Sequence, residues 1–207
     1  KSESRSQGQA RFVVALTSSG KVGVQVARGA VKFKAHNREV QVGAITVRPV
    51  PVPHDASGPL AFVLGCGESA IGHATDLGHL QRGLVGAFRA CDAVLIESNY
   101  DAGLLREGSY PWSVKARILG AWGHLSNDDI GRYLAQGLGE ACRTVVLAHI
   151  SQNNNHPELV RMTAEQALQR RGRSEVALTL TTPEGTGWLE VEPPAGAPRA
   201  AKQLRLF

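Results

Sequence analysis

The sequence has no run of about 18 apolar residues and no short apolar segment near its start. We therefore expect neither a membrane-spanning helix nor an intact secretory signal in these residues, and no membrane as a partner. Low-complexity sequence is scarce as well. The pattern indicates a globular protein rather than a membrane or fibrous one.

Cysteine is also rare, and Cys66, Cys91 and Cys142 stand singly. Neither the paired spacing of a zinc knuckle nor the even count of a disulfide framework is present. We expect reduced, buried thiols and therefore an intracellular location, with the mitochondrial matrix or another organelle favoured over the cytoplasm.

Methionine is almost absent, since Met162 is the only one and the sequence opens on Lys1. We expect the translation start to lie upstream of these residues. Processing, trimming or an unresolved N-terminal region would each account for this, and a removed organellar transit peptide is one form of processing.

The residues that are present suit one folded domain, because 43% of the 207 residues are hydrophobic and can form a sizeable core. We expect residues 1–10 to be a disordered tail, residues 11–191 to form the domain, and residues 192–207 to be a Pro/Ala-rich tail. Lys and Arg number 23 against 18 Asp and Glu. This balance suits RNA or a ribonucleoprotein as a partner, and equally an ordinary solvated surface.

Short apolar runs alternate with helix-like segments, which predicts an α/β fold. The runs 93–96 and 144–148 are continuously apolar, as is typical of strands that are buried on both faces and covered by helices. The expected strands are 12–16, 22–26, 40–50, 61–64, 70–75, 93–97, 144–150 and 176–181. The expected helices are 77–90, 111–119, 127–138 and 157–170.

Polar residues directly follow several of these strands, and such strand ends converge in an open α/β sheet. His54, Asp76, Glu97 and His149 each stand at one strand end. Histidine nitrogens and carboxylate oxygens are ligands that zinc, manganese and iron accept, so these positions are candidate metal ligands.

Each candidate also has a purely structural interpretation. Asp76 stands where it would cap the next helix, His149 would be a buried core histidine, and His54 would be a polar turn residue in a proline-rich loop. His124 precedes a helix that Ser126 or its neighbour caps, and it belongs either to that connection or to a group facing the site.

Seven ordered blocks carry a resemblance to a known family. They are Pro53-His54-Asp55-Ala56, Ala74-Thr75-Asp76-Leu77-Gly78-His79, Glu97-Ser98-Asn99-Tyr100-Asp101, Gly108-Ser109-Tyr110-Pro111, Lys115-Ala116-Arg117-Ile118, Gly123-His124-Leu125-Ser126-Asn127 and Ala148-His149-Ile150-Ser151-Gln152-Asn153-Asn154. Over residues 22–190 the chain resembles metallo-β-lactamase-fold hydrolases close to the bacterial YycJ/WalJ-type 5′-exonucleases. The resemblance implies an αββα sandwich with a dinuclear metal site that hydrolyses a phosphodiester or similar bond.

The resemblance also implies roles for individual residues. His54 would bind the first metal, His149 the second, and Asp76 would bridge the two. His124 and Asn154 would line the substrate side. Zinc or manganese is the implied cofactor if the site is complete. The Glu97-Ser98-Asn99-Tyr100-Asp101 block would support the site from behind its ligands.

Two departures from the family pattern bear on activity. The family opens with His-x-His-x-Asp-His, which this chain does not contain, and it usually has histidine where this chain has Tyr100. Without the opening motif each metal keeps two of the implied protein ligands, whereas a catalytic zinc normally has three. Two ligands are too few for a stable dinuclear site, so none is expected in this chain alone. Because the opening motif is missing, the fold is expected to be incomplete in its N-terminal half and to need a protein partner that covers the sheet.

These observations predict a catalytically impaired member of the family that acts as a structural or assembly factor, bound to RNA or to an organellar ribonucleoprotein such as a mitochondrial ribosome. The alternative is an active dinuclear-metal phosphodiesterase or exonuclease whose His-x-His-x-Asp-His motif lies upstream. A third interpretation is a hydrolase of small esters or phosphates, since a fold does not determine a substrate.

Overall fold

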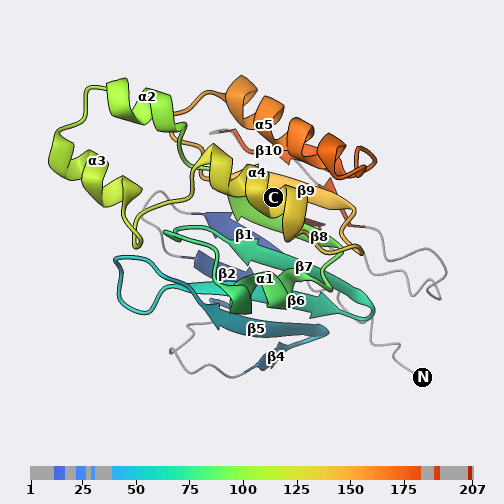
Figure 1. Ribbon diagram of the computed structural model, residues 1–207. Coiled ribbons are helices and arrows are strands. Elements are labelled where there is room, and N and C mark those ends of the chain that lie inside the picture. Colours follow the sequence, from blue (N-terminus) through green and yellow to red (C-terminus); the bar gives the residue numbers. More distant parts are fainter. Residues whose placement is uncertain are drawn as a thin grey trace, which may run out of the picture.

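The computed structural model describes residues 12–16, 22–26, 29–30, 39–182, 189–191 and 205–206. Their main feature is a seven-stranded mixed sheet in the order β10-β9-β8-β7-β6-β5-β4 (Figure 1). Its strands are β4 (Val40–Val42), β5 (Ile45–Pro51), β6 (Leu60–Cys66), β7 (Ser69–Ala74), β8 (Ala93–Glu97), β9 (Thr144–Ala148) and β10 (Ala177–Leu180). The helices are α1 (Arg82–Phe88), α2 (Ala102–Glu107), α3 (Trp112–Leu119), α4 (Asn127–Gln136) and α5 (Pro157–Arg170).

Two smaller sheets accompany the main one. β1 (Phe12–Leu16), β2 (Val22–Val26) and β3 (Gly29–Ala30) pair in sequence order as antiparallel strands. β11 (Leu189–Glu190) pairs with β12 (Arg205–Leu206). The predicted 1–10 tail lies outside the described residues, and so does the predicted 192–207 tail apart from β12.

The direction of the strands places the site. β7, β8, β9 and β10 are parallel neighbours, while β5 and β7 are both antiparallel to β6 and so run in the same direction. The carboxyl ends of β5, β7, β8 and β9 therefore lie at one edge of the sheet, as the sequence predicted for its polar strand ends.

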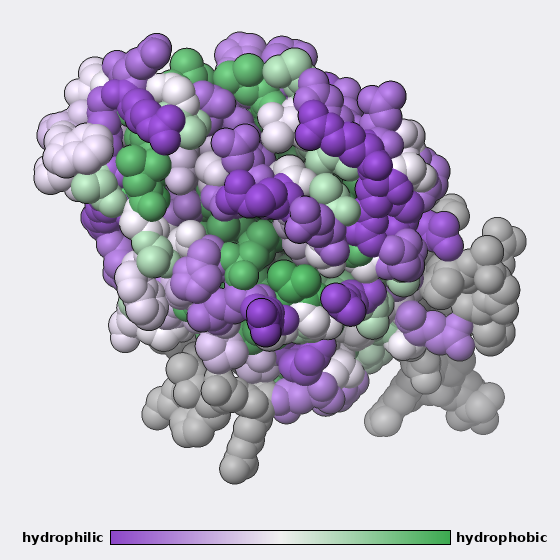
Figure 2. Space-filling view, viewed as in Figure 1, coloured by the Kyte–Doolittle hydropathy of each residue, from purple (hydrophilic) through white to green (hydrophobic). Residues whose placement is uncertain are grey.

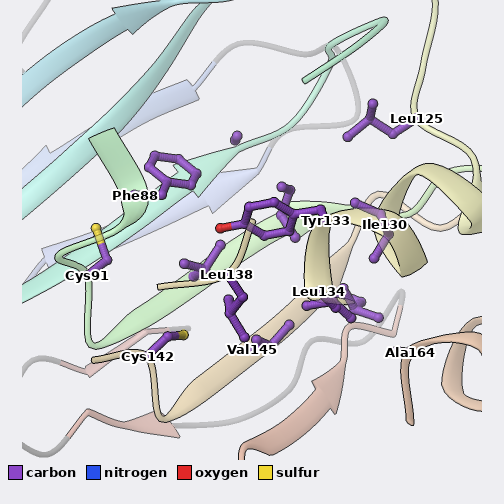
Figure 3. Close-up of a cluster of buried hydrophobic side chains, with 14 of the residues drawn as sticks. Phe88, Cys91, Leu125, Ile130, Tyr133, Leu134, Leu138, Cys142, Val145 and Ala164 are labelled. Atoms are coloured by element: carbon purple, nitrogen blue, oxygen red, sulfur yellow. The ribbon is translucent and has the colours of Figure 1, made fainter. Parts of the chain in front are cut away.

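Helices α1, α4 and α5 pack on one face of the sheet (Figure 1). Figure 3 shows this core, in which Phe88 of α1 and Tyr133 of α4 lie over strand residues such as Val145. Gly72 of β7 leaves the space for the Phe88 ring, since a Cβ at Gly72 would lie 2.8 Å from ring carbons. This close contact holds α1 against the strand that leads to the site.

The opposite face of the sheet is buried as well, which confirms the expectation for the continuously apolar strands. Leu95 and Val146 are buried there beside Leu189, and Ile71 is buried beside Val191. The expectation that helices cover both faces is wrong for the described residues, because Leu189 and Val191 of the C-terminal segment supply part of this cover.

Three local differences from the predicted elements have physical reasons. The strand expected over 40–50 is a hairpin, because Gly43 turns the chain with a φ of 61°. The helix expected from Leu77 begins at Arg82, because residues 76–81 form a loop at the sheet edge. α2 was not predicted. Among the described residues, no helix combines the length and apolarity that a bilayer crossing needs.

Candidate metal centre

The polar residues at the four strand ends come together at one edge of the sheet. Ligand atoms of Asp76, Glu97, His124 and His149 all lie within 4.8 Å of one another. His54 joins them through His124, since the two imidazole centroids are 5.1 Å apart, and the centroids of His124 and His149 are also 5.1 Å apart. The result is a compact group of three histidines and two carboxylates.

Glu97, the last residue of β8, is the centre of this group and is fully buried. Its Oε1 accepts hydrogen bonds from His124 Nδ1 at 3.0 Å and from the Leu125 amide at 2.8 Å. Its Oε2 accepts from His149 Nδ1 at 3.0 Å and from the Asp76 amide. The Glu97 carboxylate therefore joins its own strand to three other segments of the site. Each of its oxygens already accepts two hydrogen bonds, so Glu97 supports the site rather than binding a metal.

The same bonds set the charges. Burial alone would raise the pKa of Glu97, but the hydrogen bonds from His124 and His149 outweigh burial and lower this pKa from 4.5 to about 2. Burial likewise opposes the charged form of His149, yet the bond to Glu97 leaves the pKa of His149 raised. Because Nδ1 of both histidines donates to a carboxylate, Nε2 is the nitrogen that each ring keeps for another partner.

His54 is oriented in the same way by a backbone acceptor. Its Nδ1 donates to the Gly123 carbonyl at 3.0 Å, and its Nε2 faces two carboxylates, with Asp55 Oδ1 at 3.7 Å and Asp76 Oδ1 at 4.0 Å. The loop that carries His54 is fastened by the Asp55 amide, which donates to the Trp122 carbonyl at 3.1 Å, and by an ion pair between Asp55 and Arg117. The loop after α3 thus fixes the position of His54 at the sheet edge.

Asp76 supplies an unused carboxylate. In the described chain, no hydrogen bond ends on its side-chain oxygens; Oδ1 lies 3.5 Å from His149 Nδ1 and 4.0 Å from His54 Nε2. The alternative that Asp76 caps a helix is wrong, because Gln81 holds the N-cap position of α1. A partly buried carboxylate between histidines that expose Nε2 is a donor set that fits a divalent transition metal.

A buried amide network holds the backbone behind His149. Asn99 donates through Nδ2 to the His149 carbonyl at 2.9 Å, and its own carbonyl accepts from the Ser151 amide at 2.9 Å. Asn155 donates to the carbonyls of Ser98 and Asn99, at 3.0 Å each. These contacts support the predicted role of the Glu-Ser-Asn block as a brace for the site.

The remaining predicted residues hold the scaffold. Asn154 is 2% exposed and its side chain bonds to Ser151, so it lies inside the loop that carries His149, and its catalytic role stays a prediction. Asp101 caps α2 by accepting from two backbone amides. Ser126 caps α4, as predicted, and Tyr100 is buried beside it.

One relationship was not predicted, namely that His124 shares Glu97 with His149. The only sequence signal for it was that His149 follows an apolar strand and His124 precedes a capped helix. Which histidine meets which carboxylate is determined by the tertiary fold, since Glu97 and His124 are 27 positions apart.

The chain is similar in sequence to two bacterial exodeoxyribonucleases, although no protein-family model matches it. The exodeoxyribonuclease YycJ of Bacillus anthracis is 35% identical over 130 residues, which are 63% of this chain and 49% of that protein. The exodeoxyribonuclease WalJ of Streptococcus pneumoniae is 36% identical over 121 residues, 58% of this chain and 45% of that protein. The chain thus spans about half the length of these curated relatives.

A solved structure supports the fold. The metallo-β-lactamase-fold protein YhfI from Bacillus subtilis matches with a TM-score of 0.53 and 14% identity, over 75% of this chain and 54% of that one. At this identity the match speaks for the fold alone. The chain therefore has the α/β architecture of the metallo-β-lactamase fold, and over its matched residues it resembles the YycJ and WalJ exodeoxyribonucleases.

Proposed function

We propose that this chain carries part of the centre of a metal-dependent phosphodiesterase that acts on nucleic acid. The observation that carries the proposal is the Glu97 carboxylate, which holds the Nδ1 atoms of His124 and His149 and so leaves their Nε2 atoms available. Carboxylates that orient histidines in this way are typical of working metal sites.

The residues that would hold metal are His54, Asp76 and His149, with His124 beside them. Zinc and manganese both suit nitrogen and carboxylate donors. When bound, such an ion would polarise a phosphoryl oxygen and lower the pKa of a water molecule. With His124 the site has four candidate donor residues in all, one more than the three, His54, Asp76 and His149, that the sequence assigned.

The first candidate from the sequence, a catalytically impaired factor on RNA or on a mitochondrial ribonucleoprotein, stays a prediction. One observation that led to it was the tyrosine at position 100. This observation weighs less in the structure, because Tyr100 is buried beside the N-cap residue Ser126, where it contributes to packing. The intact arrangement around Glu97 and the similarity to exodeoxyribonucleases support the active alternative.

The test uses the protein expressed from its complete reading frame. Metal content measured by mass spectrometry and cleavage of 5′-labelled DNA and RNA are compared for the wild type, Asp76→Asn and His149→Ala. We expect bound zinc or manganese with metal-dependent cleavage in the wild type, and loss of both in the two variants. A panel of small esters and phosphates separates this activity from small-substrate hydrolysis.

The matched control is Asp128→Asn, which neutralises an exposed carboxylate in the first turn of α4. It should keep the metal content and activity of the wild type. A protein without metal, or cleavage that persists at wild-type level in His149→Ala, would overturn the proposal. An inactive protein that binds RNA tightly would favour the impaired factor instead.

A further inference from the structure

A pocket lies beside the candidate metal centre, between the His54 loop and α3. It is lined by His54, Asp55, Val114, Arg117, Ile118, Gly123 and His124. Its volume is about 180 Å³. Pockets that enclose drug-sized ligands measure roughly 300–1,000 Å³, so this one has room for a single base-sized group next to the centre.

The face of α3 that lines the pocket combines apolar surface with a cation. Val114, Arg117 and Ile118 are spaced three and four residues apart and so share one side of the helix. Val114 is 39% exposed, and the Arg117 side chain is 70% exposed. Aliphatic walls beside a guanidinium suit a planar base that is joined to a phosphate.

Arg117 is oriented yet still has hydrogen-bonding capacity. Its Nε donates to the Asp55 carboxylate. Among the described residues, the guanidinium has no other hydrogen-bond partner. The two terminal Nη groups remain for another acceptor. Because Asp55 neutralises the cation in part, Arg117 favours a ligand that offers both charge and directed acceptors, as a phosphate does.

Trp122 directly precedes Gly123, one of the residues that line the pocket, and it is 61% exposed. Its carbonyl accepts from the Asp55 amide, so the backbone of Trp122 is fixed to the pocket wall. In Figure 2 the surface over α2 and α3 mixes hydrophobic, pale and hydrophilic residues, whereas the surface over α5 is mostly hydrophilic. An exposed tryptophan beside a phosphate-binding group is a stacking platform for an unpaired base.

We propose that this pocket binds one unpaired nucleotide of a nucleic-acid strand, with Trp122 and Val114 contacting the base and Arg117 contacting the phosphate. The inference rests on the proposed function and names its substrate class, a strand end or single strand rather than a closed duplex. The pocket is next to His54 and His124, so a strand held there passes the centre.

The test measures binding without catalysis. A 5′-fluorescein single-stranded DNA 12-mer is titrated in EDTA, and anisotropy gives the Kd. We expect Trp122→Ala to raise Kd about tenfold, with Trp122→Phe restoring most of the affinity. Arg117→Gln should weaken binding and lower the salt-dependence slope by about one. A closed hairpin duplex should bind more weakly than the single strand.

The matched control is Trp112→Ala. Trp112 is 70% exposed on α3, and it lies on the side of this helix opposite Val114, Arg117 and Ile118, whereas Trp122 directly precedes the pocket residue Gly123. Its Kd should equal that of the wild type. The inference would be overturned if Trp112→Ala and Trp122→Ala lost affinity equally, if neither lost affinity, or if the wild type did not bind the oligonucleotide. It would also be overturned if Trp122 mediated self-association of the protein instead of oligonucleotide binding.

The two proposals fail separately. Asp76→Asn should abolish cleavage while leaving oligonucleotide binding in EDTA unchanged. If cleavage persists in Asp76→Asn but Trp122→Ala weakens binding, the proposed centre fails and the pocket stands. If cleavage depends on Asp76 but Trp122→Ala binds like the wild type, the pocket inference alone fails.

Discussion

Asp76 and His149 adopt the same unusual backbone conformation on two sides of the candidate centre. Their φ angles are 59° and 54°, and among the described non-glycine residues they alone have positive φ. This region costs an L-residue about 1–2 kcal/mol, and such strain persists where surrounding contacts enforce it. Here Glu97 Oε2 accepts from both residues, from the Asp76 amide and from His149 Nδ1.

The strain at Asp76 predicts a difference between two substitutions. Asp76→Gly relieves the positive φ, while Asp76→Ala keeps it, and neither removes a hydrogen bond to the side chain. In EDTA we expect the glycine variant to unfold with a free energy about 1 kcal/mol higher than the alanine variant. Urea denaturation measures this difference. Equal free energies of unfolding for the two variants would mean that the backbone at Asp76 is unstrained. Both variants should lose metal affinity, because both lack the carboxylate.

Glu97→Gln tests whether Glu97 organises the site. Glutamine has one acceptor oxygen, so one end of the amide would face two N–H donors that it cannot accept from. We expect the free energy of unfolding to fall by about 3 kcal/mol, because buried donors lose a charged acceptor. Metal affinity should fall by roughly 10–100-fold. Denaturation and isothermal titration with zinc measure the two effects.

Glu165→Gln is the control for Glu97→Gln. Glu165 has a side chain that is 58% exposed and pairs with Arg161 along α5. Its loss should change stability by less than about 0.5 kcal/mol and leave metal affinity unchanged. If the two substitutions had similar effects, Glu97 would not be the organising group.

His73 predicts a pH dependence. It is 2% exposed, and burial lowers its pKa from 6.5 to about 4. Below pH 6.5 the unfolded chain takes up a proton that the folded chain accepts only near pH 4, so stability is complete above pH 6.5 and falls between these values. The loss approaches about 3 kcal/mol. His73→Leu should flatten this part of the profile, measured by urea denaturation in EDTA at pH 7 and pH 4.5.

Equal slopes for the wild type and His73→Leu between these pH values would contradict the assignment. The comparison between two proteins matters, because other groups titrate in the same range. The raised pKa of His149 has the opposite effect on stability, since it favours the folded state at lower pH. This effect is the same in the wild type and in His73→Leu.

Local pattern was enough for several elements. The strand Ala93–Glu97 and the helix Pro157–Arg170 have the predicted bounds, because a continuous apolar run and an N-terminal proline determine them locally. The convergence of the polar strand ends also followed from sequence, since parallel strands share an edge. The resemblance to a known family predicted the fold, which the YhfI comparison supports.

Features that depend on distant residues were not predictable. Leu77 fits helical periodicity with Leu84, yet it lies in a loop because Asp76 is bound to Glu97 and Gly78 packs against residues 121–123. The full burial of Glu97 was hidden for the same reason. A sequence pattern places a carboxylate at a strand end, but only tertiary contacts show that histidines from two other segments donate hydrogen bonds to it.

Gly78→Ala is predicted to disturb the site from a distance, because a Cβ at Gly78 would lie 2.2 Å from the Ala121 carbonyl oxygen. That oxygen belongs to the backbone of the loop that holds His54, so the clash displaces the loop rather than a flexible side chain. We expect a loss of about 1–3 kcal/mol in the free energy of unfolding together with weaker zinc binding. Gly83→Ala is the control, since a Cβ at Gly83 in α1 meets open space and should add about 0.5–1 kcal/mol. Chemical denaturation and zinc titration of both variants decide the matter, and a Gly78→Ala protein that binds zinc as the wild type does would show that the loop after α3 does not position His54.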